Sequence, residues 1–221
     1  MIKICPFSVK FQRGDFFAEG RLRVMNENLT LQFYNDNSES YSQSTIYADM
    51  SGLCDEFLRL LPADGCILDL GCGSGRDSKY FLSHGREVIS VDGSKELCRI
   101  AGEFLGHEVI CCDFREYTPR EIFAGIWASA SLLHLEEGEI LRVIERLSRS
   151  LIDGGIFYMS FKHGNFSGIR DGRHYTDFDE DRITNIIGSV KGLEIVKLKI
   201  SEDVRNDFAG QKWINVFCIR H

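Results

Sequence analysis

Three glycines at alternate positions, Gly71, Gly73 and Gly75, follow a short and mostly apolar segment at 66–70. Segments of this kind are typical of central parallel strands that are covered on both faces. Glycine suits a turn whose backbone takes a positive φ or touches a ligand, because it has no Cβ. A helix that begins after such a turn presents free backbone N–H groups to a ligand. The pattern therefore predicts a ligand-binding turn between a buried strand and a helix.

Three carboxylates stand at the predicted carboxyl ends of successive strands. Asp69 lies near the end of the strand at 66–70, Asp92 follows a strand at 86–91, and Asp113 follows a strand at 107–112. A carboxylate in the place of Asp92 can accept hydrogen bonds from both hydroxyls of a ribose. Because open parallel sheets bind ligands at the carboxyl ends of their strands, we expect the three side chains to belong to one site.

Segment 69–75 resembles the D-x-G-x-G-x-G motif of class I S-adenosylmethionine (SAM)-dependent methyltransferases. Its spacing differs from the dinucleotide pattern G-x-G-x-x-G, whose third glycine would stand at Arg76. The chain resembles in particular the small single-domain enzymes of the tellurite-resistance type and related methyltransferase domains, which share a glycine turn followed by Arg-Asp, here Arg76-Asp77. This resemblance extends over residues 29–220.

The resemblance implies an α/β fold, a Rossmann-like three-layer α/β/α sandwich. Its seven-stranded, mostly parallel sheet has the order 3-2-1-4-5-7-6 and an antiparallel C-terminal strand. The alternating runs at 193–200 and 212–220 fit the hairpin that closes such a sheet. We expect residues 29–221 to form the methyltransferase domain and residues 1–28 to be a poorly ordered extension; a basic RNA-binding arm at 1–24 is the alternative.

The resemblance also implies the residues of the cofactor site. Tyr41 and Thr45 belong to an N-terminal helix at 29–47 that would cover SAM as a lid, although this helix and its tyrosines would equally pack without touching the cofactor. Asp69 would face the ammonium group or organise the turn, Asp92 would bind the ribose, and the pair Asp113 and Phe114 would receive the adenine. The remaining cofactor-binding positions are Gly71, Gly73, Gly75, Arg76, Asp77, Gly93, Ala128 and Ser129.

The acceptor side is less determined by the sequence. Arg170, Arg173 and Tyr175 lie in a loop that is rich in hydrogen-bond donors, which predicts a lid over an anionic or polar substrate. A solvated loop is the alternative. His134, which follows a strand at 123–129, has the chemistry of a general base, but its place in the family favours a structural or pocket-wall role. The catalytic residues are therefore left unassigned.

Thr176 or Asp177 is expected to cap the helix that ends at 190.

Composition restricts the class of protein. The net charge of −7 makes a broad nucleic-acid-binding face unexpected, and no apolar run is long enough for a membrane helix. The chain holds eight cysteines but no C-x-x-C pair, which indicates buried, reduced thiols in a cytoplasmic protein and no metal site.

The sequence therefore predicts an enzyme that transfers the methyl group of SAM to a small-molecule acceptor by in-line displacement. A methyltransferase acting on RNA or protein would keep the same cofactor residues and stays an alternative. A nicotinamide-dependent oxidoreductase is disfavoured by the spacing of the glycines and by Asp113. The sequence identifies neither the acceptor nor the oligomeric state.

Overall fold

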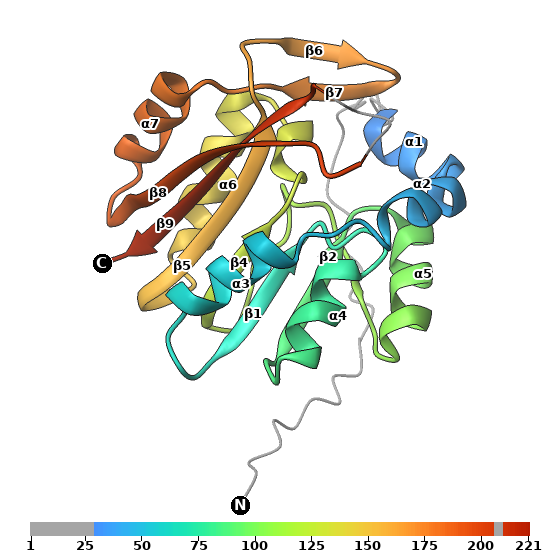
Figure 1. The fold of residues 1–221 in the computed structure, drawn as a ribbon, viewed down its shortest axis with the longest axis horizontal. Helices are drawn as coiled ribbons and strands as arrows, with labels where there is room; N and C mark the ends of the chain where they lie inside the picture. The colour runs from blue at the N-terminus through green and yellow to red at the C-terminus, as the bar shows by residue number, and fades with distance from the viewer. Residues whose placement is uncertain (1–28, 206–209) are drawn as a thin grey trace, which may run out of the picture.

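The computed structural model describes residues 29–205 and 210–221. The predicted extension at 1–28 therefore lies outside the described residues. Figure 1 shows a central twisted sheet with helices packed on both of its faces. In the described part of the chain, no helix combines the length and the apolarity that crossing a membrane requires.

The central sheet has the order β3-β2-β1-β4-β5-β9-β8. With β8 and β9 as its sixth and seventh strands, this is the predicted order. Strands β1 to β5 are parallel to one another, whereas β9 is antiparallel to both β5 and β8. The strands are β1 (Cys66–Leu70), β2 (Val88–Asp92), β3 (Ile110–Cys111), β4 (Phe123–Ala128), β5 (Leu151–Lys162), β8 (Leu193–Glu202) and β9 (Lys212–Arg220).

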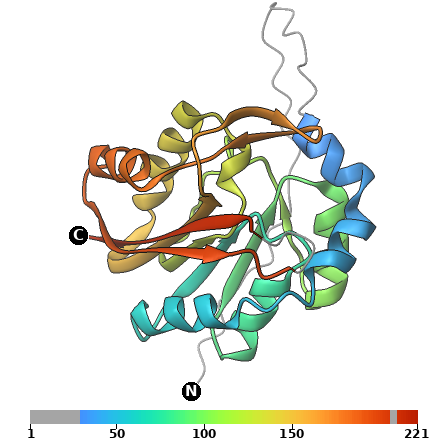
Figure 2. The ribbon, with the colours of Figure 1, turned by 45° about the horizontal axis from the view of Figure 1, so that its top comes forward.

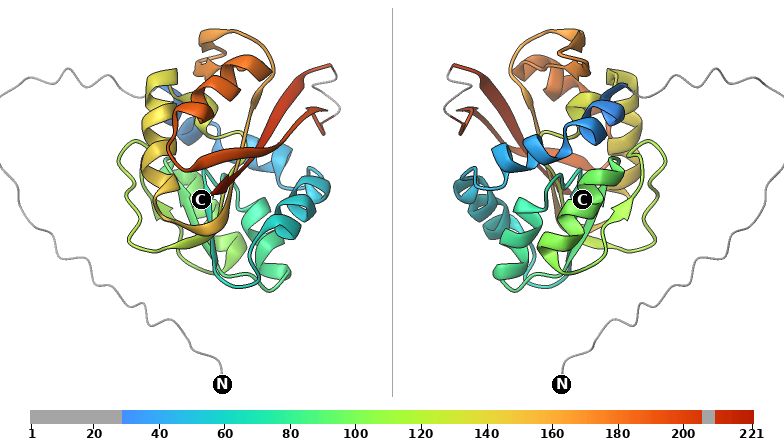
Figure 3. Two further views of the ribbon diagram at one scale, coloured as in Figure 1. Left: turned by 90° about the vertical axis from the view of Figure 1, so that its left-hand side faces the viewer. Right: turned by 90° about the vertical axis from the view of Figure 1, so that its right-hand side faces the viewer.

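Helices cover the two faces of this sheet, as Figure 3 shows. The helical segments are α1 (Leu29–Asp36), α2 (Ser38–Thr45), α3 (Ser51–Leu60), α4 (Arg76–Ser83), α5 (Lys95–Leu105), η1 (Leu132–His134), α6 (Glu137–Ser148) and α7 (Glu180–Ser189). Successive residues of β4 point to opposite faces because the strand period is two. Trp127 packs among α3 and α4, whereas Ile126 and Ala128 pack with α6 and α7. The predicted three-layer α/β/α sandwich is confirmed.

A second, two-stranded sheet lies where the sequence predicted an irregular loop. Strands β6 (Ser167–Arg170) and β7 (Arg173–Thr176) form an antiparallel hairpin in which Arg170 is paired with Arg173. The two turn residues, Asp171 and Gly172, have φ values of 50° and 75°. Two consecutive positive φ angles in an Asp-Gly loop are characteristic of a type I′ turn. The sequence signal for this hairpin was therefore present but not used.

Several predicted boundaries were wrong. The N-terminal helix is divided into α1 and α2 at Asn37, and the third strand is reduced to Ile110–Cys111 at the sheet edge. Helix α7 is capped by Asp179, whose side chain accepts from the N–H of Arg182. The predicted caps have other partners, since Thr176 donates to the carbonyl of Leu135 and Asp177 pairs with Arg170.

The prediction that the cysteines are buried is wrong at Cys111. All seven cysteines in the described part of the chain are free thiols, and Cys111 is exposed on the edge strand β3. An edge strand has one face and one side open to solvent, which explains why its side chains are accessible.

Candidate functional site

The glycine turn between β1 and α4 has the conformation that its residues predict. Gly71, Gly73 and Gly75 have φ values of 79°, 57° and 86°, all in the left-handed region. A Cβ at Gly71 would lie 2.4 Å from the Cβ of Ser131, so this glycine is required by packing. A Cβ at Gly73 would meet only the ring of Tyr41, at 3.5 Å. The backbone at Gly73 therefore faces open space, as a ligand-binding turn requires.

A small cleft lies directly on this turn and is called the glycine-turn cleft. Its lining residues come from the turn, from α2, from the start of α4 and from the residue after β4. They are Tyr41, Thr45, Gly71, Cys72, Gly73, Ser74, Arg76, Asp77 and Ser129. Of the predicted cofactor residues, this set leaves out Asp69, Gly75, Asp92, Gly93, Asp113, Phe114 and Ala128.

Asp92 is held at the carboxyl end of β2 by backbone donors. Its two carboxylate oxygens accept the N–H of Gly73 at 2.9 Å and the N–H of Ser94 at 2.8 Å. Burial raises the pKa of Asp92 to about 6. Each oxygen keeps a second lone pair, so these bonds leave acceptor capacity for a ribose hydroxyl. The ribose contact stays a prediction.

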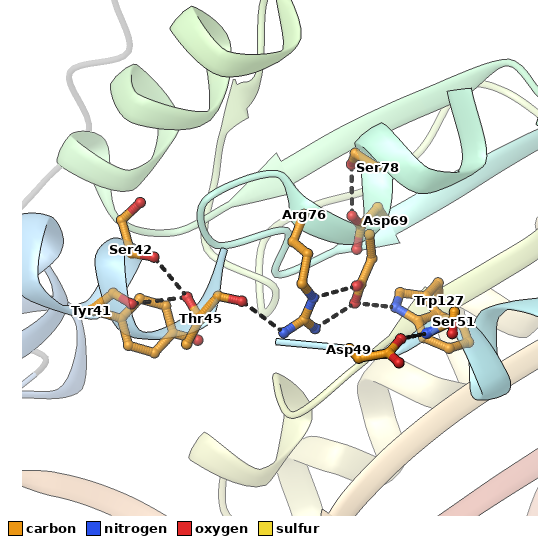
Figure 4. Close-up of polar contacts among 10 residues, drawn as sticks. Tyr41, Ser42, Thr45, Asp49, Ser51, Asp69, Arg76, Ser78 and Trp127 are labelled. Carbon is orange, nitrogen blue, oxygen red and sulfur yellow. Dashed lines mark hydrogen bonds and ion pairs between the residues drawn. The ribbon is translucent and has the colours of Figure 1, made fainter. Parts of the chain in front are cut away.

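Asp69 joins the turn to its surroundings. It is buried, and one of its oxygens accepts from the hydroxyl of Ser78 at 2.6 Å (Figure 4). The same Ser78 hydroxyl lies 2.7 Å from that of Ser90. Burial and the nearby carboxylate of Asp77 raise the pKa of Asp69. Because Asp69 connects β1 to α4 and β2, its contacts favour the role of turn organiser over that of an ammonium ligand.

The half-buried Arg76 and the buried Asp77 form an ion pair that connects three elements; Figure 4 shows Arg76 between Thr45 and Trp127. The guanidinium donates to both oxygens of Asp77, at 2.6 and 2.9 Å, and to the carbonyl of Thr45 in α2 at 3.2 Å. The indole N–H of Trp127 in β4 donates to Asp77 at 2.9 Å. The Trp127 ring is itself stacked on Tyr158, with ring centroids 3.8 Å apart. This network aligns α2 and α4 beside the end of β4.

The predicted adenine residues lie on the other side of the glycine turn. The ring of Phe114 lies beside Gly71, because a Cβ added at Gly71 would be 3.1 Å from Cζ of Phe114. Asp113 is already engaged, because Arg115 donates to it from both its backbone N–H and its side-chain Nε at 2.9 Å. An adenine amino group would share this carboxylate with Arg115, which sequence reasoning did not foresee.

Helix α1 packs over the ends of β2 and the start of α5. The side chain of Leu31 in α1 leaves no room for a Cβ at Gly93, because that Cβ would lie 2.6 Å from Cδ2 of Leu31. The amide oxygen of Asn35 accepts from the hydroxyl of Ser94 at 2.8 Å. Figure 2 shows α1 and α2 running along this edge of the molecule, with the β6–β7 hairpin beside α1. The hairpin and α1 are joined by a bond from the N–H of His174 to the hydroxyl of Thr30, at 3.1 Å.

A second and larger hollow, called the large cleft, opens next to the glycine-turn cleft. Its empty volume is about 1000 Å³. The two clefts share four lining residues: Tyr41, Thr45, Arg76 and Ser129. Beyond these, the large cleft is bounded by the segment after β4, by Ser160 and Lys162 of β5, by the hairpin, and by the facing ends of β8 and β9.

His134 lies in the wall of the large cleft with both ring nitrogens occupied. Its Nδ1 is 2.8 Å from the carbonyl oxygen of His174, which can only accept, so Nδ1 carries the proton. Its Nε2 therefore accepts from the hydroxyl of Tyr34, also at 2.8 Å. Burial lowers the pKa of His134 to about 4, so the ring is neutral near pH 7. These contacts support the pocket-wall interpretation.

The two arginines predicted for the acceptor side have different surroundings. Arg173 lines the large cleft, with its guanidinium 4.2 Å from the ring centroid of Phe33. Arg170 is not among the lining residues; it pairs with Asp177 at 3.0 Å and lies over Phe166. Tyr175 lines the cleft and is buried. Of the loop candidates, Arg173 and Tyr175 therefore reach the cleft.

Comparison with known proteins identifies the family of this fold. Residues 67–155 match the sequence model of the family described as "Methyltransferase domain". This match places a methyltransferase domain within residues 67–155 of the chain. This confirms the family resemblance predicted from the glycine turn. The matched residues contain β1 to β4 and the glycine turn between β1 and α4.

Individual relatives of the methyltransferase domain are distant. A segment is 33% identical over 93 residues to the 18S rRNA (guanine-N(7))-methyltransferase bud23 of Schizosaccharomyces pombe; the match covers 39% of this chain and only 35% of that protein. Among solved structures, 1,6-didemethyltoxoflavin-N1-methyltransferase of Burkholderia thailandensis, crystallised with 1,6-didemethyltoxoflavin and S-adenosylhomocysteine, is 18% identical with a TM-score of 0.72 and 93% of each chain covered. A TehB-like SAM-dependent methyltransferase of Corynebacterium glutamicum is 20% identical with a TM-score of 0.65, over 84% of this chain and 99% of that one. At these identities the structural matches show a common fold.

Four residues in or beside the clefts were missed by sequence reasoning. Trp127 donates to Asp77 beside the clefts, Arg205 follows the end of β8, Trp213 lies at the start of β9, and Lys162 ends β5. The only available signal was their position at strand ends, because each owes its place to the folding of distant strands toward one edge of the sheet.

Proposed function

We propose that this chain is a SAM-dependent methyltransferase that acts on a small molecule. One observation carries this proposal: the glycine-turn cleft and the large cleft adjoin at Tyr41, Thr45, Arg76 and Ser129. A donor that lies on the glycine turn would thus face an acceptor in the large cleft across a short junction. The large cleft is lined by aromatic side chains and a limited number of polar groups, as small-molecule sites usually are.

The residues around the turn fit SAM as the donor. The open space at Gly73 admits a ligand against the backbone, and Asp92 keeps lone pairs for ribose hydroxyls. The hydroxyl of Ser131, buried beside Gly71, has no hydrogen-bond partner among the described residues and is available to a bound ligand. When bound, SAM supplies a methyl group that its sulfonium centre has already activated.

The contribution of the protein is then alignment. The Arg76–Asp77–Trp127 network fixes the junction between the clefts, to which α2 contributes Tyr41 and Thr45. Holding two reactants in the correct geometry can lower a barrier by about 7–11 kcal/mol in favourable cases. The neutral His134 holds Tyr34, and with it α1, against the cleft wall.

The test is a thermal-shift comparison of SAM, S-adenosylhomocysteine (SAH) and NAD on the wild-type chain. A ligand at 100 times its Kd stabilises by about 2.7 kcal/mol, which for a chain of this size is roughly 5–11 °C. We expect a shift with SAM and SAH and none with NAD. Gly73→Val should abolish the SAH shift, while Gly85→Val, at an exposed turn with a similar φ of 76° and no atom near its Cβ, should keep it. A shift with NAD alone would contradict the proposal.

An RNA acceptor is the second candidate, because the S. pombe relative is named as an rRNA methyltransferase. The aromatic lining of the large cleft and the net charge of −7 favour the small molecule. Methyl transfer from labelled SAM to total RNA, compared with transfer to a small-metabolite extract, distinguishes the two.

A further inference from the structure

Two cations of the large cleft lie around one aromatic ring. The ammonium of Lys162, at the end of β5, is 4.4 Å from the ring centroid of Tyr175. The guanidinium of Arg173, in β7, is 5.4 Å from the same centroid. All three side chains line the cleft. The ring gives both charges a partly favourable surface but no negative charge.

The other cations at this place are neutralised by carboxylates. Arg76 is paired with Asp77, Arg205 with Asp203, and Arg170, outside the cleft, with Asp177. By contrast, within residues 29–205 and 210–221 no carboxylate lies within 4 Å of the charged groups of Lys162 or Arg173.

Burial makes this pair of unpaired cations costly. Arg173 has a buried Nε without a hydrogen-bond partner in the described part of the chain. Burial and the charges of Arg170, Arg173 and Arg205 lower the pKa of Lys162, although the carboxylate of Asp177 acts in the opposite direction. Partly buried charges that repel one another are retained at a cost in stability, and a bound anion would remove that cost.

The walls of the cleft limit what kind of anion fits. The cleft lining includes Tyr34, Leu133 and Trp213 in addition to Tyr175, together with three carboxylates, Asp171, Glu202 and Asp203. This mixed apolar and polar lining offers more contact surface than a small inorganic ion can use. It suits a planar apolar body that stacks or packs against the rings.

We propose that the methyl acceptor is an organic anion with a planar, apolar body whose carboxylate-like group is bound by Lys162 and Arg173. This inference rests on the proposed function. Both cations line the large cleft but not the glycine-turn cleft, so they hold the end of the acceptor that lies away from the donor. The rest of the acceptor then extends toward the junction at Ser129 and Arg76.

Binding of matched probes to the SAH-saturated full chain tests the proposal by isothermal titration calorimetry. The probes are 2-naphthoate, its neutral counterpart 2-naphthamide, and inorganic phosphate. We expect 2-naphthoate to bind about tenfold or more tightly than 2-naphthamide, since charge-assisted hydrogen bonds are the stronger kind. Phosphate should bind more weakly than 2-naphthoate because it has no apolar body.

Variants assign the effect to the two residues. K162M and R173Q should each lower 2-naphthoate affinity about tenfold and leave SAH affinity unchanged. K162R should keep most of the affinity, and K199M, at an exposed lysine of β8 outside the cleft, should keep all of it. Unfolding temperatures measured without ligand verify that each variant is folded.

Several results would overturn the proposal. These are equal affinity for 2-naphthoate and 2-naphthamide, absence of 2-naphthoate binding, phosphate binding as tight as 2-naphthoate, or displacement of 2-naphthoate by a short single-stranded RNA. Weaker SAH binding in folded K162M and R173Q would assign the cations to the cofactor. Failure of the wild-type chain to bind SAH would instead contradict the proposed function itself, which makes the two failures distinguishable.

Discussion

Replacing Gly71 by alanine should destabilise the protein through a single contact. Gly71 and Gly85 have nearly equal φ values of 79° and 76°. An alanine in this left-handed region costs about 1–2 kcal/mol, and this cost is common to both positions. At Gly85 no atom lies within 4 Å of the added Cβ, whereas at Gly71 the Cβ of Ser131 would be 2.4 Å away. A Cβ is fixed by its own backbone, so Ser131 cannot rotate away.

The magnitude follows from this comparison. Overpacking of a tightly packed site costs about 1–3 kcal/mol. The free energy of unfolding of Gly71→Ala should therefore be lower than that of Gly85→Ala by about 1–3 kcal/mol, which at about 2–4 °C per kcal/mol is roughly 2–12 °C in Tm. The shift of Ser131, and of Phe114 beside it, should also weaken SAH binding in Gly71→Ala alone.

Urea unfolding and thermal shift with SAH measure the two effects. Equal loss of stability in the two alanine variants would refute the reasoning, because the contact with Ser131 would then have no energetic consequence. Normal SAH affinity in a destabilised Gly71→Ala variant would separate the turn's packing from the cofactor site.

Three further predictions concern buried polar groups. Trp127→Phe removes the donor to Asp77 and should lower the free energy of unfolding by about 1–3 kcal/mol in urea titrations, because a buried carboxylate oxygen loses a partner. Folding raises the pKa of Asp92 from 3.8 to about 6, so protonated Asp92 stabilises the ligand-free protein below pH 4, and this stabilisation is lost as the pH rises through 6. The loss in the free energy of unfolding is about 3 kcal/mol, at 1.36 kcal/mol per pKa unit. The corresponding fall in Tm with rising pH should disappear in Asp92→Asn. Asp179→Ala should lower the free energy of unfolding by about 0.5–2 kcal/mol because it removes the cap of α7, while Asp181→Ala in the same first turn should change it by no more than about 0.5 kcal/mol. Equal effects of the two substitutions would show that Asp179 stabilises the helix through its negative charge and not through the cap hydrogen bond.

Much of the fold was predictable because its signals are local. The apolar run at 66–70, the alternation at 212–220 and the glycines of the turn each report on neighbouring residues only. Ser94 illustrates the same point, since its side chain accepts from the N–H of Leu97 as a cap at that position should. The Asp171-Gly172 turn was equally local, and its hairpin was missed through neglect of that signal.

For the site, the sequence predicted which strand ends lie close together. Asp92 lies where a ribose ligand is expected, beside Gly73. The sequence contained no information on which polar groups would already be engaged, so the pairing of Asp113 with Arg115 was not foreseen. The same limit applies to Asp69, whose partners Ser78 and Ser90 come from two other elements.

The sequence by itself determined the family resemblance and the position of the glycine turn, because both follow from a pattern within a few consecutive residues. The strand order was implied by that resemblance. Only the tertiary structure decided which charges stay unpaired. Arg170 and Arg173 are three residues apart and chemically identical, yet Arg170 meets Asp177 and Arg173 meets aromatic rings and the large cleft. Lys162 joins Arg173 there because β5 and β7 meet around Tyr175. Charge neutralisation depends on distances of a few ångströms between side chains, and those distances are set by the packing of whole elements.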